Sequence, residues 1–311
     1  MSRACVTVFG LDVRADVPLS FLRGASATPT GRGLDVCSMT RRAAAGEDHG
    51  FESVCDHVEP DGSLSFRIEV HPEAGYLLSG PNYGVHLLSA DGRRLSCWPE
   101  DAGGDAWQRL LVAQVLPFAA VLQGLEVFHA SAVVIDRQAI GLVGPSRAGK
   151  TSVALELCRL GAGFLADDVL VLEREAGELI GHPGSPMAGV DRVEVERTHR
   201  QLTSAEVVGA NDRELLVRMQ AAGAPAPLAA LFFLDRRPDG PVRPRFEPIA
   251  DARTLLAATF NFVLASPRRL SSLLDICALA AQRPVQRIVL GPSVDASQVG
   301  EAVAQRLHEL A

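Results

Sequence analysis

One short run of the sequence carries the residues best suited to chemistry. It is Gly144-Pro145-Ser146-Arg147-Ala148-Gly149-Lys150-Thr151, a full match to the phosphate-binding pattern G-x-x-x-x-G-K-[ST]. In such a loop the backbone N–H groups and the amino end of the following helix attract phosphates, and the lysine adds positive charge. The candidate nucleotide-binding residues are therefore Gly144, Pro145, Ser146, Arg147, Ala148, Gly149, Lys150, Thr151 and Ser152.

Lys150 is the only lysine among 311 residues, and the other 29 of the 30 basic residues are arginine. A compositional bias toward arginine explains those 29 but not the position of the one exception. A guanidinium is bulkier than an ammonium and donates in a fixed fork, whereas a compact ammonium can reach phosphates along a narrow path. The single lysine therefore strengthens the prediction of a nucleotide site.

Two adjacent carboxylates and a histidine flank the loop in sequence. Asp167 and Asp168 follow Lys150 by 17 and 18 residues, and His129 precedes it by 21. Beside a triphosphate, one carboxylate can hold Mg²⁺ while the other accepts the proton of an attacking hydroxyl, and the Thr151 hydroxyl is also suited to Mg²⁺. An acidic turn would show the same carboxylate pair, and a lone histidine in an apolar segment is more often a core or turn residue than a catalytic one.

The surrounding pattern predicts an α/β core that presents the loop between a strand and a helix. Apolar residues at helical spacing predict a helix over 150–160, with Gly161 suited to end it. The continuous apolar run 228–234 predicts a strand buried on both faces. The remaining elements expected in this part are strands over 125–135, 139–143, 164–172 and 285–290, and helices over 268–281 and 296–310.

The N-terminal third predicts a mostly β accessory domain. Short apolar runs at 6–9, 63–70, 75–79 and 84–88 alternate with turn formers, whereas 23–50 shows no clear period and predicts a long loop. A Gly- and Asp-rich break at 101–105 precedes an apolar helix expected over 107–124. The expected domains are therefore 1–105, for substrate recognition, and 106–311, for catalysis.

Composition excludes several classes of function. The net charge of −7 comes without a basic stripe, which argues against a nucleic-acid partner. The most apolar stretch, 110–128, is interrupted by polar residues and proline, which argues against a membrane partner. Six scattered cysteines fit neither a zinc site nor a disulfide framework, and the N-terminus has no secretory pattern, so a cytoplasmic protein is expected.

The segment from His129 to Leu172 resembles the catalytic domain of bacterial HPr kinase/phosphorylase and its smaller serine-kinase relatives, which include enzymes that phosphorylate lasso-peptide precursors. In that family a histidine-led strand precedes the phosphate-binding loop, and Ala-Asp-Asp follows its helix. The resemblance implies that Asp167 is the general base toward a serine hydroxyl, that Asp168 helps to place Mg²⁺, and that His129 supports the acidic site. The glycine- and isoleucine-rich signature of true HPr kinases is missing from 181–190, so a peptide, or a protein other than HPr, is the better expected acceptor.

The sequence thus predicts an ATP- and Mg²⁺-dependent kinase that acts on a serine of a peptide or protein, with Asp167, His129 and Lys150 as catalytic residues. Two alternatives stay open at this point: a kinase of a small hydroxylated metabolite, and a regulator that binds nucleotide without transferring it. The sequence does not fix the acceptor, the preference for ATP over GTP, or the oligomeric state, for which a homo-oligomer stays open. Asp235 is a weaker metal candidate than Asp168, and candidate contacts to phosphate or to an acidic substrate come from Arg192, Arg197, Arg200, Arg236, Arg237, Arg268 and Arg269.

Overall fold

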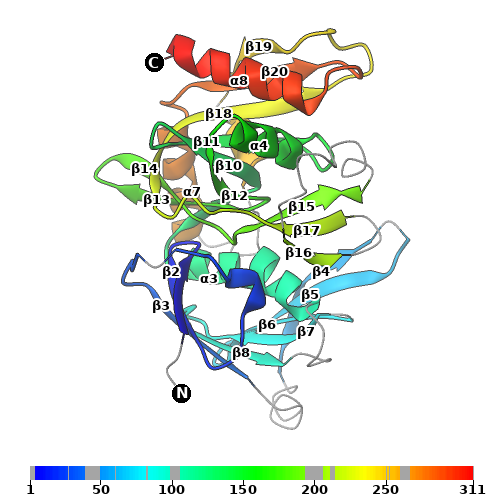
Figure 1. Cartoon of the computed structure of the whole chain (residues 1–311). Coiled ribbons are helices and arrows are strands. Elements are labelled where there is room, and N and C mark those ends of the chain that lie inside the picture. Colours follow the sequence, from blue (N-terminus) through cyan, green and yellow to red (C-terminus); the bar gives the residue numbers. More distant parts are fainter. Residues whose placement is uncertain are drawn as a thin grey trace. The chain divides into compact units, whose positions relative to one another are not determined.

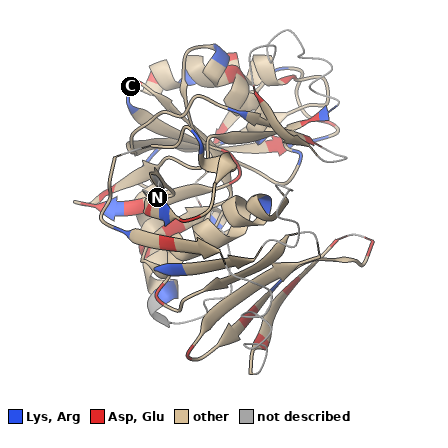
Figure 2. Cartoon of the chain, turned by 60° about the horizontal axis from the view of Figure 1, so that its bottom comes forward, with Lys and Arg blue, Asp and Glu red and all other residues tan. Residues whose placement is uncertain are grey.

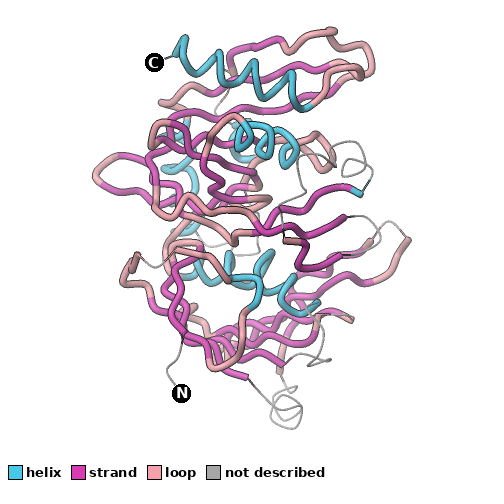
Figure 3. The backbone as a smooth tube through the Cα atoms, in the orientation of Figure 1, coloured by secondary structure: helices cyan, strands magenta, loops and turns pink. Residues whose placement is uncertain are grey.

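The computed structural model describes residues 4–26, 28–38, 50–59, 61–81, 83–98, 106–192, 206–210, 214–249, 251, 253–259 and 267–310. The chain divides into two compact units, one of residues 1–125 with 261–264 and the other of 126–260 with 265–311 (Figure 1). In the described part of both units, strands outnumber helices (Figure 3). The expected α/β class with a mostly β N-terminal part is confirmed.

The first unit contains an eight-stranded sheet of order β1-β2-β3-β8-β7-β6-β5-β4, in which β3 runs parallel to both β2 and β8. Alternate residues point into its core, as at Leu34 and Val36 of β3, both fully buried. This strand lies inside 23–50, where the sequence predicted a loop. The strands are β1 (Ala4–Val8), β2 (Leu11–Ala15), β3 (Gly33–Ser38), β4 (Glu52–Val58), β5 (Leu64–His71), β6 (Gly75–Gly80), β7 (Gly84–Leu88) and β8 (Arg94–Trp98).

A helical stretch after the sheet belongs to the first unit. It comprises α2 (Ala106–Leu110), the π-helical turn η2 (Leu111–Val115) and α3 (Leu116–Leu122), and a short 3-10 turn, η1 (Ser20–Leu22), precedes β3. Phe118 of α3 meets the Tyr76 ring edge-on, with 4.8 Å between ring centroids, and the Gln123 side chain donates to the Gly92 carbonyl. These contacts explain why the two units divide after Leu125 and not at residue 105, where the sequence placed the boundary. Residues 101–105 themselves lie outside the described part.

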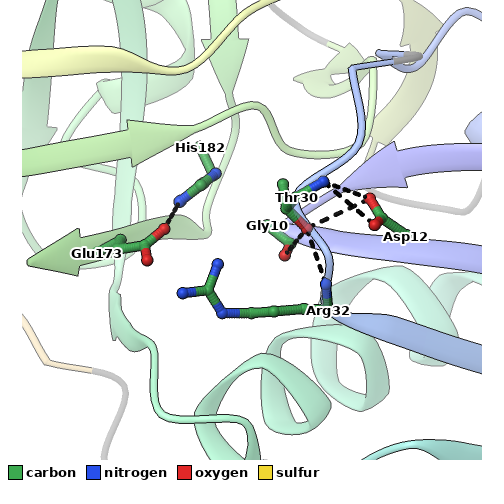
Figure 4. A network of polar contacts seen from close by, with 6 residues as sticks. All are labelled: Gly10, Asp12, Thr30, Arg32, Glu173 and His182. Atoms are coloured by element: carbon green, nitrogen blue, oxygen red, sulfur yellow. Dashed lines mark hydrogen bonds and ion pairs between the residues drawn. The ribbon is translucent and has the colours of Figure 1, made fainter. Parts of the chain in front are cut away.

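A polar network fixes the loop between β2 and β3 of this unit (Figure 4). Asp12 accepts hydrogen bonds from the Thr30 backbone N–H at 2.9 Å and from its hydroxyl at 3.2 Å. The same hydroxyl lies 2.8 Å from the Gly10 carbonyl and accepts a bond from the Arg32 N–H. The carboxylate therefore takes the place of backbone partners that a loop lacks.

The second unit contains a nine-stranded sheet with helices on both faces. Its strand order is β12-β10-β11-β18-β14-β13-β9, and β20 pairs with β18 on one edge and β19 on the other. The strands are β9 (Glu126–Phe128), β10 (Ala130–Ile135), β11 (Gln138–Val143), β12 (Gly163–Ala166), β13 (Leu170–Glu175), β14 (Glu178–His182), β18 (Ala226–Arg236), β19 (Arg245–Pro248) and β20 (Val285–Leu290).

Two hydrophobic cores lie on opposite faces of this sheet. On one face, Val153 and Leu157 of α4 (Lys150–Arg159) pack with Val299 of α8 (Ala296–Leu310). On the other, Leu255 of α6 (Arg253–Leu256) packs with Ile276 of α7 (Pro267–Ala280). Strand β18 contributes side chains to both cores, as expected for the continuous apolar run 228–234. The helices predicted over 150–160, 268–281 and 296–310 are confirmed to within a residue at each end.

A separate three-stranded sheet completes the second unit, with β17 (Glu214–Arg218) between β15 (Met187–Asp191) and β16 (Val207–Ala210). Ala188 and Val190 of β15 pack against Phe164 of β12, which joins this sheet to the larger one. Acidic and basic residues are interspersed along the elements of each unit (Figure 2). Within the described residues, no helix is long and apolar enough to cross a membrane.

Candidate active site

The phosphate-binding loop lies between the end of β11 at Val143 and the start of α4 at Lys150. Gly149, which precedes the helix, has a φ of 98°, a conformation that glycine adopts without steric cost. Arg147 also has a positive φ, of 64°, and it is exposed together with Pro145 and Ser146. The strand, loop and helix expected from the sequence are therefore present, with the loop's centre open to a ligand.

Lys150 is held at the base of this loop. It is 5% exposed, and its Nζ lies 3.1 Å from the Gly144 carbonyl oxygen and 3.4 Å from that of Pro145. Its third neighbour is Nε2 of His129 at 3.3 Å. An ammonium has three donors and no acceptor, so His129 Nε2 accepts this bond.

His129 is consequently a neutral imidazole with its proton on Nδ1, where it can donate to the backbone oxygen of Asp168 at 3.1 Å. Burial and the positive charge of Lys150 lower the pKa of His129, in keeping with the neutral form, although the Asp168 charge opposes them. The histidine thus links the lysine of the loop to the backbone of the acidic pair.

The Asp167 carboxylate is held by three donors from three different elements. Oδ1 accepts hydrogen bonds from the Ser131 hydroxyl at 2.6 Å and from the Thr151 hydroxyl at 2.8 Å. Oδ2 accepts one from the Gly189 backbone N–H at 3.0 Å. Burial and the charge of Asp168 raise the pKa of Asp167 to about 7, and the three hydrogen bonds act in the opposite direction. A carboxyl group with such a pKa is suited to exchange protons near neutral pH.

Asp168 differs from its neighbour in exposure and in backbone conformation. It is exposed, and its φ is 59°. Aspartate tolerates this left-handed region better than most residues, because its short polar side chain can bond locally. The two carboxylates therefore occupy different environments, one partly buried and hydrogen-bonded and the other exposed to solvent.

The acidic pair does not lie within a strand, as the sequence predicted for 164–172. β12 ends at Ala166 and β13 begins at Leu170, and between them the Val169 N–H bonds to the Asp167 carbonyl at 2.7 Å. The expected strand 125–135 is likewise broken at His129, between β9 and β10.

The two breaks lie side by side in the sheet. β10 pairs antiparallel with β12, with Ala132 opposite Ala166, whereas β9 pairs antiparallel with β13, with Phe128 opposite Leu170. His129 and the acidic pair are therefore brought together by one shared interruption of two neighbouring strand pairs. In an unbroken sheet, the backbone groups at these positions would pair with the neighbouring strand, whereas here the positions carry the polar side chains of the site.

The sequence analysis expected Thr151 to be a metal ligand together with Asp168. In the structure its hydroxyl donates to the Asp167 carboxylate, a contact that does not test that expectation. A hydroxyl that donates its proton still has oxygen lone pairs for a cation, so Thr151 and the exposed Asp168 fit the part of a Mg²⁺ site that protein supplies. Among the described residues, no group of three or more His, Cys, Asp and Glu side chains could hold a metal by itself. Mg²⁺ usually completes its shell with waters and substrate phosphates, so the fit requires no such group.

Several other candidates have structural roles elsewhere in the second unit. Asp235, at the end of β18, pairs with Arg237 at 2.6 Å. Arg236 donates to the carbonyls that precede α8, and Arg269 forms an ion pair of 2.8 Å with Glu126. Ser152 lies in the first turn of α4 and is partly buried. Arg197 and Arg200 lie outside the described residues.

The hairpin of β13 and β14 carries a second polar pair, in which His182 Nε2 lies 2.8 Å from the Glu173 carboxylate (Figure 4). His182 is 3% exposed. Because the two residues come from adjacent antiparallel strands, this contact ties the hairpin together across its face.

The sequence analysis missed two residues that contact Asp167, Ser131 and Gly189. Ser131 stands alone as a polar residue between alanines in the apolar strand β10, and that isolation is a visible sign of a buried partner. Gly189 contributes only its backbone N–H, for which the sequence has no sign.

Comparisons with known proteins add little to this geometry. No family model matches the chain, and no curated protein matches it. Among solved structures it is similar to the HPr(Ser) kinase/phosphatase from Coxiella burnetii, with 15% identity over 60% of this chain and 97% of that chain, at a TM-score of 0.32. The functional argument therefore rests on the arrangement of the site.

Proposed function

We propose that this protein is an ATP- and Mg²⁺-dependent kinase that transfers the γ-phosphoryl group to a serine hydroxyl of a peptide or protein. The observation that carries the proposal is the bond of 2.8 Å between Thr151, in the first turn after the phosphate-binding loop, and the Asp167 carboxylate. It places a carboxyl group with a pKa of about 7 beside the residues suited to phosphate and metal. Nucleotide binding alone would need no such group.

The loop and its lysine support nucleotide binding. The N–H groups at the amino end of α4 and the positive charge of Lys150 favour the phosphates of ATP. Thr151 and Asp168 would hold Mg²⁺, which when bound neutralises charge on the β- and γ-phosphates. His129 keeps the Lys150 ammonium in place without adding a second positive charge, because it is neutral.

In the proposed reaction the serine hydroxyl oxygen forms a bond to the γ-phosphorus. The bond from that phosphorus to the oxygen shared with the β-phosphate breaks, and ADP leaves with this oxygen. The hydroxyl proton moves to the Asp167 carboxylate, whose raised pKa suits it to accept and later release a proton. Asp167 is thus the general base, and Lys150 stabilises charge on the transferred group.

The acceptor in the proposal is a serine of a peptide or small protein, for which a lasso-peptide precursor is the first candidate. The first unit, with its own sheet and core, would recognise the acceptor, while all of the site residues named above come from the second unit. The lack of the HPr-specific signature in 181–190 makes HPr itself a less favoured acceptor.

The test incubates the protein with Mg²⁺, γ-labelled ATP and a panel of serine-containing peptides, HPr and a metabolite extract, and locates the label by mass spectrometry. We expect label on a peptide serine, lost in Lys150→Ala and reduced by about 100-fold or more in Asp167→Asn, since general bases contribute about 10²–10⁴ in rate. Asp275→Asn is the matched control, because it removes an exposed carboxylate of α7 that pairs with Arg174 and should retain turnover.

Each contrary outcome has a definite meaning. Full transfer by Asp167→Asn would exclude this residue as the base. Label found only on a small molecule would identify a metabolite kinase, and saturable ATP binding without any transfer would identify a nucleotide-binding regulator.

A further inference from the structure

Ser131 is a polar side chain of the site that belongs to neither the phosphate-binding loop nor the acidic pair, and it contacts Asp167 directly. It lies on β10, is fully buried, and has the buried residues Ala130 and Ala132 on either side. Burying a hydroxyl in apolar surroundings is costly unless it is hydrogen-bonded. Its partner is Asp167 Oδ1, at 2.6 Å.

The three donors to Asp167 are not equivalent. Thr151 belongs to the loop and has a second task if it holds a cation, and Gly189 contributes only backbone. Ser131 lies outside the phosphate-binding motif, and its hydroxyl has no cation-binding task in the proposed reaction. It is therefore the side-chain donor that can hold the carboxylate in one orientation.

The strand pairing supports the same conclusion. β10 lies beside β12, with Ala132 opposite Ala166, so Ser131 faces the place where β12 ends and Asp167 leaves the sheet. A residue that follows the end of a strand has no interstrand hydrogen bonds that hold its backbone and side chain in one orientation. The short bond from a neighbouring, fully buried strand supplies that fixation, and a bond of this length to a charged group is strong.

We propose that Ser131 is a positioning residue that holds Asp167 in the orientation needed to accept the proton of the acceptor hydroxyl. This inference rests on the proposed function for its catalytic consequence. The contact itself is open to a test that requires no turnover.

The first experiment measures kcat and KM for ATP in Ser131→Ala, Ser131→Cys and Ser131→Thr. Loss of a hydrogen bond to a charged group lowers kcat by about 10-fold to 100-fold in Ser131→Ala, with KM for ATP within about twofold of wild type. Cysteine fills the space of serine but is a weak donor, so Ser131→Cys should behave like Ser131→Ala, whereas Ser131→Thr should regain activity. Ser63→Ala is the matched control, because it removes a serine hydroxyl that donates to an exposed aspartate at the same 2.6 Å.

The second experiment reads the carboxylate directly. In protein labelled with ¹³C at aspartate, the Asp167 carboxyl resonance is the one missing from Asp167→Asn. We expect this resonance to move in Ser131→Ala and Ser131→Cys, to return in Ser131→Thr, and to stay in place in Ser63→Ala.

The outcomes separate this inference from the proposed function. A resonance that stays in place in Ser131→Ala, or wild-type kcat in Ser131→Ala or Ser131→Cys, overturns the positioning role. If wild type transfers no label to any acceptor, the proposed function fails, and the carboxyl resonance still decides whether Ser131 positions Asp167.

Discussion

Because His86, at the centre of β7, is buried, we expect the first unit to lose stability at acid pH. The ring is fully buried, with Nε2 3.1 Å from the Tyr83 carbonyl oxygen and Nδ1 3.4 Å from the sulfur of Cys97. The carbonyl accepts from Nε2–H, so Nδ1 is the acceptor for the thiol proton, and the imidazole is neutral. Burial lowers the pKa of His86 from 6.5 to about 4, although the bond to Tyr83 opposes this.

The sign and size of the effect follow from this difference. For a base whose pKa is lower in the folded than in the unfolded state, the free energy of unfolding is highest at pH values above the unfolded-state pKa. It decreases as the pH falls from 6.5 toward 4. The shift corresponds to about 3 kcal/mol at full protonation, and most of this is lost at pH 4.5.

The assay is urea unfolding followed by tryptophan fluorescence at pH 7 and pH 4.5. Both tryptophans, Trp98 and Trp107, lie in the first unit, and the Trp107 ring stacks on His86 with 6.2 Å between centroids. In His86→Leu the carboxylates still titrate but the imidazole does not, so the drop in unfolding free energy between the two pH values should shrink by about 2–3 kcal/mol. His57→Leu, which removes an exposed imidazole of the same sheet, is the control. Equal pH dependence in wild type and His86→Leu, to within about 0.5 kcal/mol, would refute the argument.

Two further predictions concern the second unit, and hydrogen exchange is the suitable measurement because this unit contains no tryptophan. Arg269→Met leaves the carboxylate of Glu126, which is 4% exposed, without its ion-pair partner and should lower the free energy of unfolding by about 3–5 kcal/mol. The control is Arg253→Met, which removes a side chain that is 85% exposed and should change stability by about 0.5 kcal/mol or less. Similar losses in the two variants would contradict the assignment of a buried pair. Gly149→Ala and Gly177→Ala each force alanine into a left-handed conformation, with φ of 98° and 86°, and should each cost about 1–2 kcal/mol, but calorimetry should find weaker ATP binding only for Gly149→Ala. Unchanged ATP affinity in Gly149→Ala would argue against the loop as the nucleotide site.

The sequence predicted the elements whose evidence is local. The phosphate-binding loop, the helix after it and the strand at 228–234 each have a motif or a hydrophobic period within a few residues, and the structure contains all three. β3 was missed, because only Leu34 and Val36 mark it within a stretch of small and polar residues. The helical residues 107–122 lie in the first unit, whereas the sequence analysis grouped them with 106–311, because their partners in the first sheet are distant in sequence.

The motifs of the sequence marked His129, Lys150, Asp167 and Asp168, but neither Ser131 nor Gly189, and they did not indicate how these residues contact one another. In the structure the His129 ring lies between the Lys150 ammonium and the Asp168 carbonyl oxygen. The break of the strand at the acidic pair was not predicted, because apolar residues on both sides give the pattern of a continuous strand. The bond from Thr151 to Asp167, and not to Asp168, depends on which carboxylate turns inward, and a spacing along the chain does not determine that direction.

The shared interruption of the two strand pairs also decides where this chain can change in length. Because Ser131 faces Asp167 through the pairing of β10 with β12, adding or deleting one residue between 130 and 135 would turn the serine to the opposite face of the sheet. The turn at Asp136 and Arg137, at the other end of β10, joins it to β11 and carries none of the site residues. Insertions and deletions should therefore accumulate at that turn among related sequences, whereas the segment that begins at His129 keeps a constant length.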